Sequence, residues 1–148
     1  MNMSEISGLF PIVTGGKFKL EKKVVPIDGS MGMSTAILNK RVNHIPLTSQ
    51  EAKAETARKV LVKNARRVLV GIVQTAVASG SAISVISGNH YQTITGVGTV
   101  DQETCFMVED SLTGRGEIVT AGQFLREAIA AQVSDNAGQI ELAWLKKN

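Results

Sequence analysis

The chain has 148 residues and a mass of 15.8 kDa, which fits one domain with a single core. It is 43% hydrophobic and 20% charged, with a net charge of +3, so it can bury a core and does not belong to the disordered class. Its longest apolar runs, such as residues 68–73, are far shorter than the roughly 20 residues of a membrane-spanning helix. We therefore expect no membrane span.

In chain order, the sequence predicts an arm or short strand within residues 1–23, helices over 35–42, 49–64 and 66–78, strands over 82–87, 91–97 and 104–110, a helix over 121–132 and a strand over 139–145. Local signals mark the helix ends. Thr48 or Ser49 can cap the second helix with Glu51 in its first turn, Ser79-Gly80 can stop the third, and Thr120 can cap the fourth. Helices followed by strands indicate an α+β fold, with N-terminal helices packed on a mostly antiparallel sheet.

The sequence lacks a recognisable secretory signal and has only one cysteine. The N-terminus has no basic start followed by an apolar stretch, which is the pattern of a secretory signal, so we expect a cytoplasmic chain or export by a signal-independent route. The single cysteine, Cys105, excludes a disulfide framework and a multi-cysteine zinc site. Its mid-strand position favours a buried structural thiol.

His90 and Asp110 are the first candidates for chemistry. If the hairpin between the strands 91–97 and 104–110 has its tip at Val100, His90 lies directly opposite Asp110 on one face of the sheet. Opposed side chains have Cβ atoms roughly 4.5–5.5 Å apart, so the carboxylate can orient the imidazole. Gln92 shares this face and Tyr91 takes the other. The pair forms the base and orienter of a nucleophilic triad, or else an ordinary surface pair at a sheet edge.

A nucleophile is harder to find. By strand parity Cys105 points away from His90. Ser34 follows Gly32-Met33 and begins a helix, where backbone N–H groups and the helix dipole favour a developing negative charge. The alternative for Ser34 is a plain N-cap.

Four segments resemble the papain-like cysteine proteases. Asp28-Gly-Ser-Met-Gly-Met-Ser34-Thr-Ala-Ile is similar to the stretch from the oxyanion-hole Gln to the nucleophile helix, and residues 78–97 are similar to the strand that bears the catalytic His. Phe106-Met-Val-Glu-Asp110-Ser-Leu-Thr-Gly and the segment 118–125 resemble the compact bacterial branch, which includes leader-peptide peptidases of bacteriocin exporters and effector proteases delivered into host cells. The resemblance covers residues 24 to 145, so it implies a papain-like domain over 24–148 after the arm at 1–23.

The resemblance implies a role for each candidate residue. Position 34 would attack a peptide carbonyl, His90 would accept and return the proton, and Asp110 would orient His90. The oxyanion would be held by the backbone N–H of residue 34 and by a group near Asp28, although a carboxylate at Asp28 repels an oxyanion unless it is protonated or turned away.

The chain departs from the family at the nucleophile. The family has Cys where this chain has Ser34, or Met31 or Met33 if the alignment slides. A hydroxyl must lose its proton during attack, whereas the family relies on a preformed thiolate–imidazolium pair, so we expect the chain as written to be nearly inactive. Either a native cysteine has been changed to Ser34, which is the explanation we favour, or the chain is a naturally degenerate pseudoenzyme.

Three functions therefore remain open at the sequence level. The leading one is a cysteine peptidase, whose partners would be a peptide or protein substrate and a protein target or inhibitor. A protein-binding module with an inherited cleft is the second, and a peptidoglycan amidase or acyl transferase is the third. No cofactor is implied, because Gly96-Val-Gly98 lies in a hairpin and lacks the helix of a phosphate-binding motif. Two histidines and one cysteine do not make a metal site.

The charges are divided along the chain. Residues 40–67 hold eight Lys or Arg against two Glu, and residues 101–135 hold seven acids against two Arg. The basic segment could contact an acidic partner or simply face water. No aromatic side chains interleave with its charges, so nucleic acid is a disfavoured partner.

Overall fold

A computed structural model describes residues 18–27, 29–87, 90–110, 113–135 and 138–147. In chain order its elements are β1 (Phe18–Pro26), the 3-10 turn η1 (Gly29–Met31), α2 (Thr35–Val42), α3 (Ser49–Ala78), β2 (Ile83–Ser87), β3 (His90–Val100), β4 (Glu103–Asp110), β5 (Gly116–Thr120), α4 (Ala121–Asp135) and β6 (Gln139–Lys147). The described part of the chain is thus α+β, as the sequence predicts, and it holds three α-helices and a six-stranded sheet.

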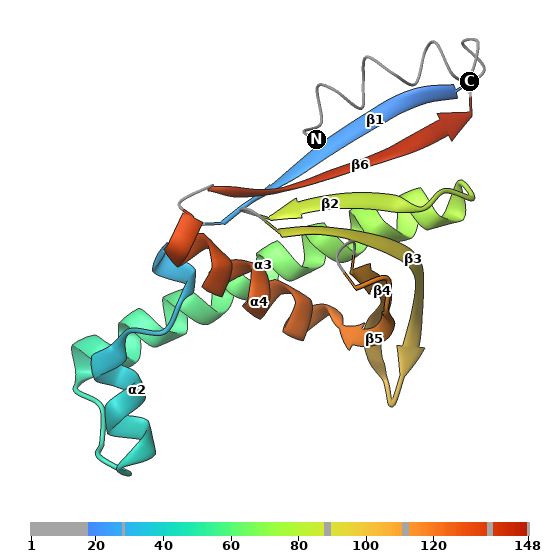
Figure 1. The fold of residues 1–148 in the computed structure, drawn as a ribbon. Helices are drawn as coiled ribbons and strands as arrows, with labels where there is room; N and C mark the ends of the chain where they lie inside the picture. The colour runs from blue at the N-terminus through green and yellow to red at the C-terminus, as the bar shows by residue number, and fades with distance from the viewer. Residues whose placement is uncertain (1–17, 28, 88–89, 111–112, 136–137, 148) are drawn as a thin grey trace.

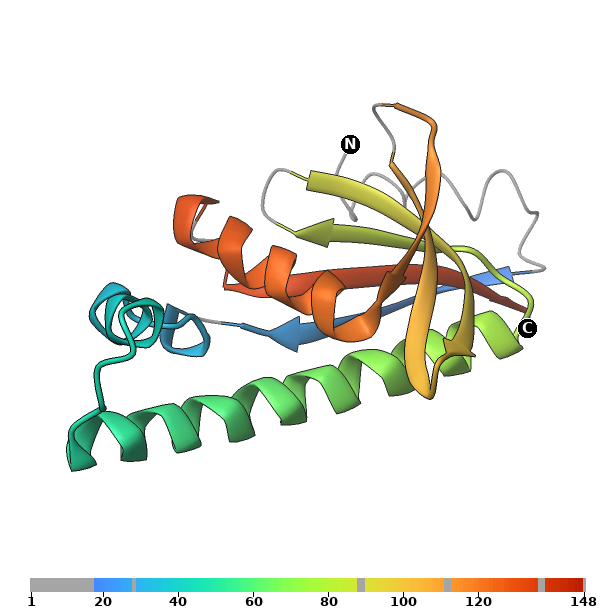
Figure 2. The ribbon, with the colours of Figure 1, turned by 90° about the horizontal axis from the view of Figure 1, so that it is seen from below.

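The sheet is open and entirely antiparallel. Its strand order is β1-β6-β2-β3-β4-β5, so the first and last strands of the chain pair with each other at one side. Helices α3 and α4 pack on the same face of this sheet, with α3 running obliquely across it (Figures 1 and 2). No described helix is both long and apolar enough to cross a membrane.

The core lies between the two helices and the sheet. Leu69 and Val73 of α3 are fully buried there, as is Ile94 of β3. Phe106 of β4 meets Phe124 of α4 edge-to-face, with ring centroids 5.7 Å apart. Such aromatic pairs contribute about 0.5–1.5 kcal/mol beyond the area that they bury. This packing holds α4 against β4, next to the β5 edge of the sheet.

The expectation of separate helices over 49–64 and 66–78 is wrong, because α3 is one helix of 30 residues. The proposed boundary contains no glycine or proline that could end a helix, and Ala65 at that point is buried. Thr48 begins the helix with a capping box, in which its hydroxyl accepts from Glu51 N–H and the Glu51 carboxylate accepts from Thr48 N–H. The helix ends, as predicted, at Ser79, and Gly80 follows with a φ of +85°.

Two strands go beyond the prediction. Residues 18–23, expected as a short strand or an arm, form the start of β1, which extends to Pro26 and pairs with β6 over its whole length. Residues 1–17 of that arm lie outside the described part. The sequence also missed β5, which pairs with β4 from Gly116 to Thr120 and runs directly into α4. Pro26 is tolerated because it ends a strand at the edge of the sheet.

Candidate functional site

His90 and Asp110 contact each other at one end of the β3–β4 hairpin. Nε2 of His90 lies 3.0 Å from Oδ2 of Asp110, with side chains that are 48% and 28% exposed. Since the carboxylate can only accept, Nε2 carries the proton in neutral His90, and Nδ1 is then the basic nitrogen. Among the described residues, Nδ1 has no hydrogen-bond partner. The pair therefore presents an oriented imidazole with a free lone pair.

The predicted register of the hairpin is wrong, although the predicted pair forms. The tip is the two-residue turn Asp101-Gln102, both with positive φ, and not Val100, so the strands near the tip are offset from the expected pairing. This offset alone would place His90 and Asp110 on opposite faces. A bulge at Thr95 inserts one extra residue into β3, which returns His90 to the same face of the sheet as Asp110.

The bulge leaves His90 diagonal to Asp110. Gln92 is the residue directly opposite Asp110, and His90 lies two positions further along the same face. Diagonal neighbours on one face of a sheet are within reach of long or aromatic side chains. Gln92 shares the face of His90, as predicted, and Tyr91 packs on the other face beside Ala143.

The turn after β4 holds Asp110. Thr113 N–H donates to Oδ1 of Asp110 at 3.4 Å, so the carboxylate accepts on both oxygens. Gly114 N–H donates to the Asp110 carbonyl at 2.9 Å, and Gly114 has a φ of +68°, which glycine adopts without strain. Asp110 N–H donates in turn to the Arg115 carbonyl. These bonds fix the carboxylate, and with it the His90 ring.

A small hollow of about 40 Å³ adjoins His90 on the helix side of the sheet. Its lining residues, besides His90, are Ser87, Gln92, Phe124, Glu127, Ala128 and Ala131. Helix α4 lines it with Phe124, Ala128, Ala131 and Glu127, and the sheet lines it with polar side chains. A substrate group that approaches His90 would therefore enter between the sheet and α4.

Ser34 is the N-cap of α2 and is exposed. Its Oγ accepts from Ile37 N–H at 3.2 Å, which satisfies one orphan donor of the first turn. Within the described part of the chain Ser34 and His90 are not hydrogen-bonded to each other. The plain cap that the sequence offered as an alternative is therefore present, and it leaves the hydroxyl engaged with its own helix.

The turn before Ser34 packs against two helices. η1 contacts both α3 and α4, and the half-buried Met31 packs against the core. Helix α4 also lines the hollow beside His90. It therefore contacts both the segment before the candidate nucleophile and the hollow beside the candidate base. Met33 is half-buried in the link between η1 and α2.

An ion-pair network that the sequence analysis missed supports this segment. Glu55 of α3 is buried, and its carboxylate accepts from Arg58 at 2.7 and 3.1 Å and from Arg41 of α2 at 3.4 Å. Arg58 also donates to the Met31 carbonyl at 3.2 Å. Hydrogen bonding to Arg58 lowers the pKa of Glu55 below its ordinary value, against the opposing effect of burial. The i,i+3 spacing of Glu55 and Arg58 was the available signal.

The remaining candidates do not add chemistry to the pair. Asp28 lies outside the described residues. Cys105 is a buried free thiol and points to the opposite face of the sheet from Asp110, as predicted. Among the described residues, no group of three or more His, Cys, Asp or Glu side chains could hold a metal ion. The site therefore has a base and an orienter but no thiol.

The comparisons with known proteins give no further assignment. No family model matches the chain, and neither a curated protein nor a solved structure matches it.

Proposed function

We propose that this chain carries a papain-like peptidase site built on His90 and Asp110, in which the nucleophile is missing. The observation that carries this proposal is the 3.0 Å contact between Nε2 of His90 and Oδ2 of Asp110. The carboxylate fixes the tautomer and the ring, so that Nδ1 serves as the base toward a thiol placed beside it. The substrate class is a peptide or a protein.

The proposal gives each residue a role. A thiol in the segment 31–34 would give its proton to His90 Nδ1, attack a peptide carbonyl, and leave His90 to return the proton to the departing amine. Asp110 would stabilise the imidazolium formed in between. Backbone N–H groups at the start of α2, including that of residue 34, would hold the oxyanion.

As it stands, the chain binds a peptide without cleaving it. Cys105 is buried on the other face, and a serine hydroxyl at position 34 is a weak nucleophile that already caps α2. The surface around the small hollow beside His90 then acts as a protein-binding surface. This combines the peptidase fold with the binding-module alternative of the sequence analysis.

The test restores the thiol. Cysteine is introduced separately at Ser34, at Met31 and at Met33, and each variant is assayed for cleavage of an unfolded protein substrate and of a peptide library. We expect thiol-dependent cleavage with Ser34→Cys, or with one of the two neighbouring positions, and its loss on adding His90→Ala. Wild-type protein, which keeps only the buried Cys105, is the control for background activity. If none of the three variants cleaves peptide, the peptidase proposal is wrong.

A further inference from the structure

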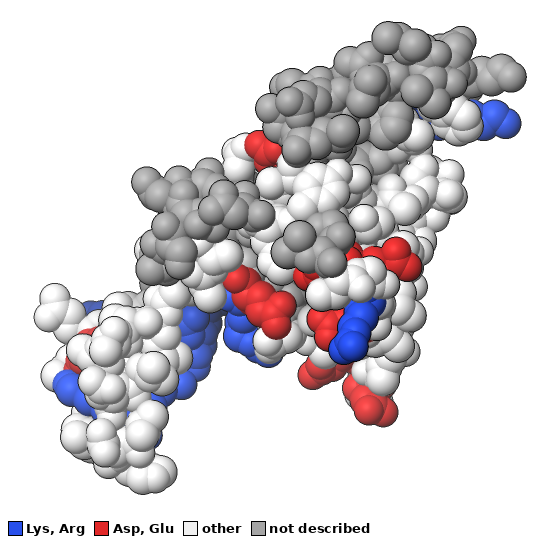
Figure 3. Space-filling view, viewed as in Figure 1, with Lys and Arg blue, Asp and Glu red and all other residues white. Residues whose placement is uncertain are grey.

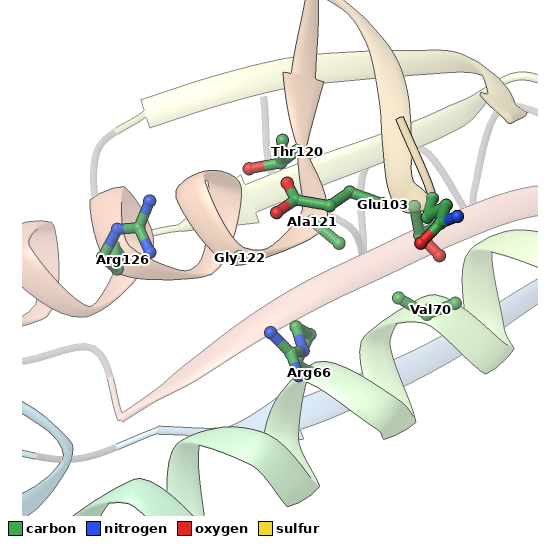
Figure 4. Close-up of a pocket in the computed structure, with 9 residues that line it drawn as sticks. Arg66, Val70, Glu103, Thr120, Ala121, Gly122 and Arg126 are labelled. Carbon is green, nitrogen blue, oxygen red and sulfur yellow. The ribbon is translucent and has the colours of Figure 1, made fainter. Parts of the chain in front are cut away.

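A second and larger hollow lies away from His90, where α3, α4 and the tip of the β3–β4 hairpin meet. Its volume is about 350 Å³, within the range of small-ligand sites. The lining residues are Arg66, Val70, Gln102, Glu103, Thr104, Thr120, Ala121, Gly122 and Arg126. Figure 4 shows this pocket, with Arg66 reaching from α3 toward the first turn of α4.

Two guanidinium groups from different helices converge in this pocket. The position that a Cβ would take at Gly122 lies 3.7 Å from Nη1 of Arg126 and 3.8 Å from Nη1 of Arg66. Both groups therefore approach the same point above the first turn of α4. Glycine leaves that point open, although glycine inside a helix costs about 1 kcal/mol relative to alanine.

The charges of the two arginines are not compensated within the described part of the chain. Arg66 makes no hydrogen bond or ion pair there, and Arg126 donates only to the neutral Gln123 amide oxygen, at 2.7 and 3.3 Å. Glu103 lines the pocket but forms no ion pair with either arginine among these residues. Like charges that converge without a counter-ion repel each other, so the arrangement favours an anion between them.

The first turn of α4 lines the same pocket and adds backbone donors. Thr120 Oγ1 accepts from Gln123 N–H at 3.0 Å, which caps one N–H of the first turn of α4. The N–H groups of Ala121 and Gly122 belong to the same turn, whose first donors have no intrahelical acceptor. This end of α4 also carries the positive end of the helix dipole. Two arginine forks and these N–H groups together suit a tetrahedral dianion.

A neighbouring hollow extends the positive surface along α3. It shares Arg66 and Val70 with the pocket and is also lined by Lys63 and Arg67, with a volume of about 340 Å³. A ligand whose anionic end lies between Arg66 and Arg126 can therefore extend over a basic surface. This continuity favours an organic anion over an isolated ion.

We propose that this pocket binds a phosphate dianion, either free phosphate or the terminal group of a small organic phosphate. Arg66 and Arg126 hold its oxygens from two sides, and the first turn of α4 holds a third. Glu103 lines the same pocket, and its carboxylate weakens the binding of an anion. The proposal is independent of the site at His90.

The test is calorimetric titration of the full chain with inorganic phosphate, with glycerol 3-phosphate and with neutral glycerol. We expect one saturable site for a phosphate ligand and no binding of glycerol. Tighter binding of glycerol 3-phosphate than of phosphate assigns the organic phosphate, and equal binding assigns free phosphate. Absence of binding by both phosphate ligands overturns the proposal.

Variants locate the site. Arg66→Gln and Arg126→Gln should each weaken binding about tenfold, the effect of losing a charged hydrogen bond, while Glu103→Gln should tighten it. Lys53→Gln is the matched control, because it removes one exposed charge from the same helix and Lys53 lines neither hollow. Equal weakening by Lys53→Gln and Arg66→Gln indicates general attraction of anions to a basic surface and overturns the site.

Gly122→Ala supplies a variant that does not endanger the fold. The added methyl group meets both guanidinium groups at ordinary contact distance and narrows the pocket, while alanine favours the helix. We expect weaker phosphate binding together with an unchanged or higher melting temperature. Unchanged affinity in this variant would place the anion elsewhere.

Discussion

Among the described residues, Glu55 is the only buried charged side chain. Its carboxylate joins α3 to α2 through Arg41 and, through Arg58, to the carbonyl of Met31. The segment that holds the candidate nucleophile is thus fixed to α3 by one carboxylate. Removing one partner of a buried ion pair leaves the other charge buried and uncompensated. The resulting loss of stability is larger than the net stabilisation that the intact pair provides.

Glu55→Gln should therefore lower the free energy of unfolding by about 3 kcal/mol. Urea unfolding followed by circular dichroism measures this change. Glu117→Gln is the matched control, since Glu117 is exposed on β5 and its replacement should change stability by less than about 0.5 kcal/mol. Equal stability of the two variants would show that the Glu55 network does not stabilise the fold.

The same carboxylate predicts a pH dependence. Hydrogen bonding to Arg58 lowers the pKa of Glu55 in the folded state, so its contribution is fully present above the unfolded-state pKa of about 4.3 and is lost as pH falls through the lower folded-state pKa. The stability difference between wild type and Glu55→Gln should be constant near neutral pH and shrink below about pH 4. Unfolding midpoints measured from pH 7 to pH 3 test this. A difference that grows on acidification has the wrong sign.

The contact of His90 with Asp110 predicts one tautomer. Neutral His90 should carry its proton on Nε2, because the carboxylate accepts there. Ring nitrogen shifts in ¹⁵N NMR distinguish the two tautomers directly. Asp110→Ala should give a mixture, whereas Gln92→Ala, a change on the same face, should leave the Nε2–H form dominant. Dominance of the Nδ1–H form in wild type would contradict the proposed base.

Among the secondary-structure elements, the helix caps were predicted better than the helix lengths. Thr48 and Thr120 cap their helices as expected, because capping depends on a few adjacent residues. The continuation of α3 through Ala65 depends on burial against a sheet that only the folded chain provides. Gly96 was the available signal for the bulge at Thr95, because a glycine inside a strand often marks a bulge. The predicted register assumed a regular hairpin and therefore contained no bulge.

The capping box of α3 makes a prediction at this scale. Thr48→Ala should reduce the free energy of unfolding by about 1 kcal/mol, because it leaves Glu51 N–H without its acceptor. Thr75→Ala is the matched control: Thr75 is an exposed threonine of the same helix whose hydroxyl only donates back to the Gly71 carbonyl. It should be neutral or slightly stabilising, since alanine is the better helix former. Denaturant unfolding of both variants decides; equal losses would exclude a specific cap.

At the scale of the whole molecule, the fold class was predictable but the sheet order was not. The alternation from Phe18 onward indicates a strand, yet nothing local shows that it pairs with β6 at the far end of the chain. The division of charge along the sequence does persist in space. Basic side chains lie toward α2 and α3 and at the far end of β1 and β6, and most acidic ones gather toward the β3–β4–β5 end, with basic side chains beside them (Figure 3). The pocket between Arg66 and Arg126 lies between these regions, and only the folded chain brings its walls together.

The pH dependence of thiol alkylation in the cysteine variants at positions 34, 31 and 33 tests whether His90 and Asp110 form a catalytic base. Wild type measures the background of the buried Cys105. If His90 and Asp110 form a peptidase-type base, one introduced thiol reacts rapidly at pH 6, well below the ordinary thiol pKa of about 8.5, and His90→Ala removes this reactivity. Three thiols that react only as pH approaches 8.5, with rates unchanged by His90→Ala, would contradict the account.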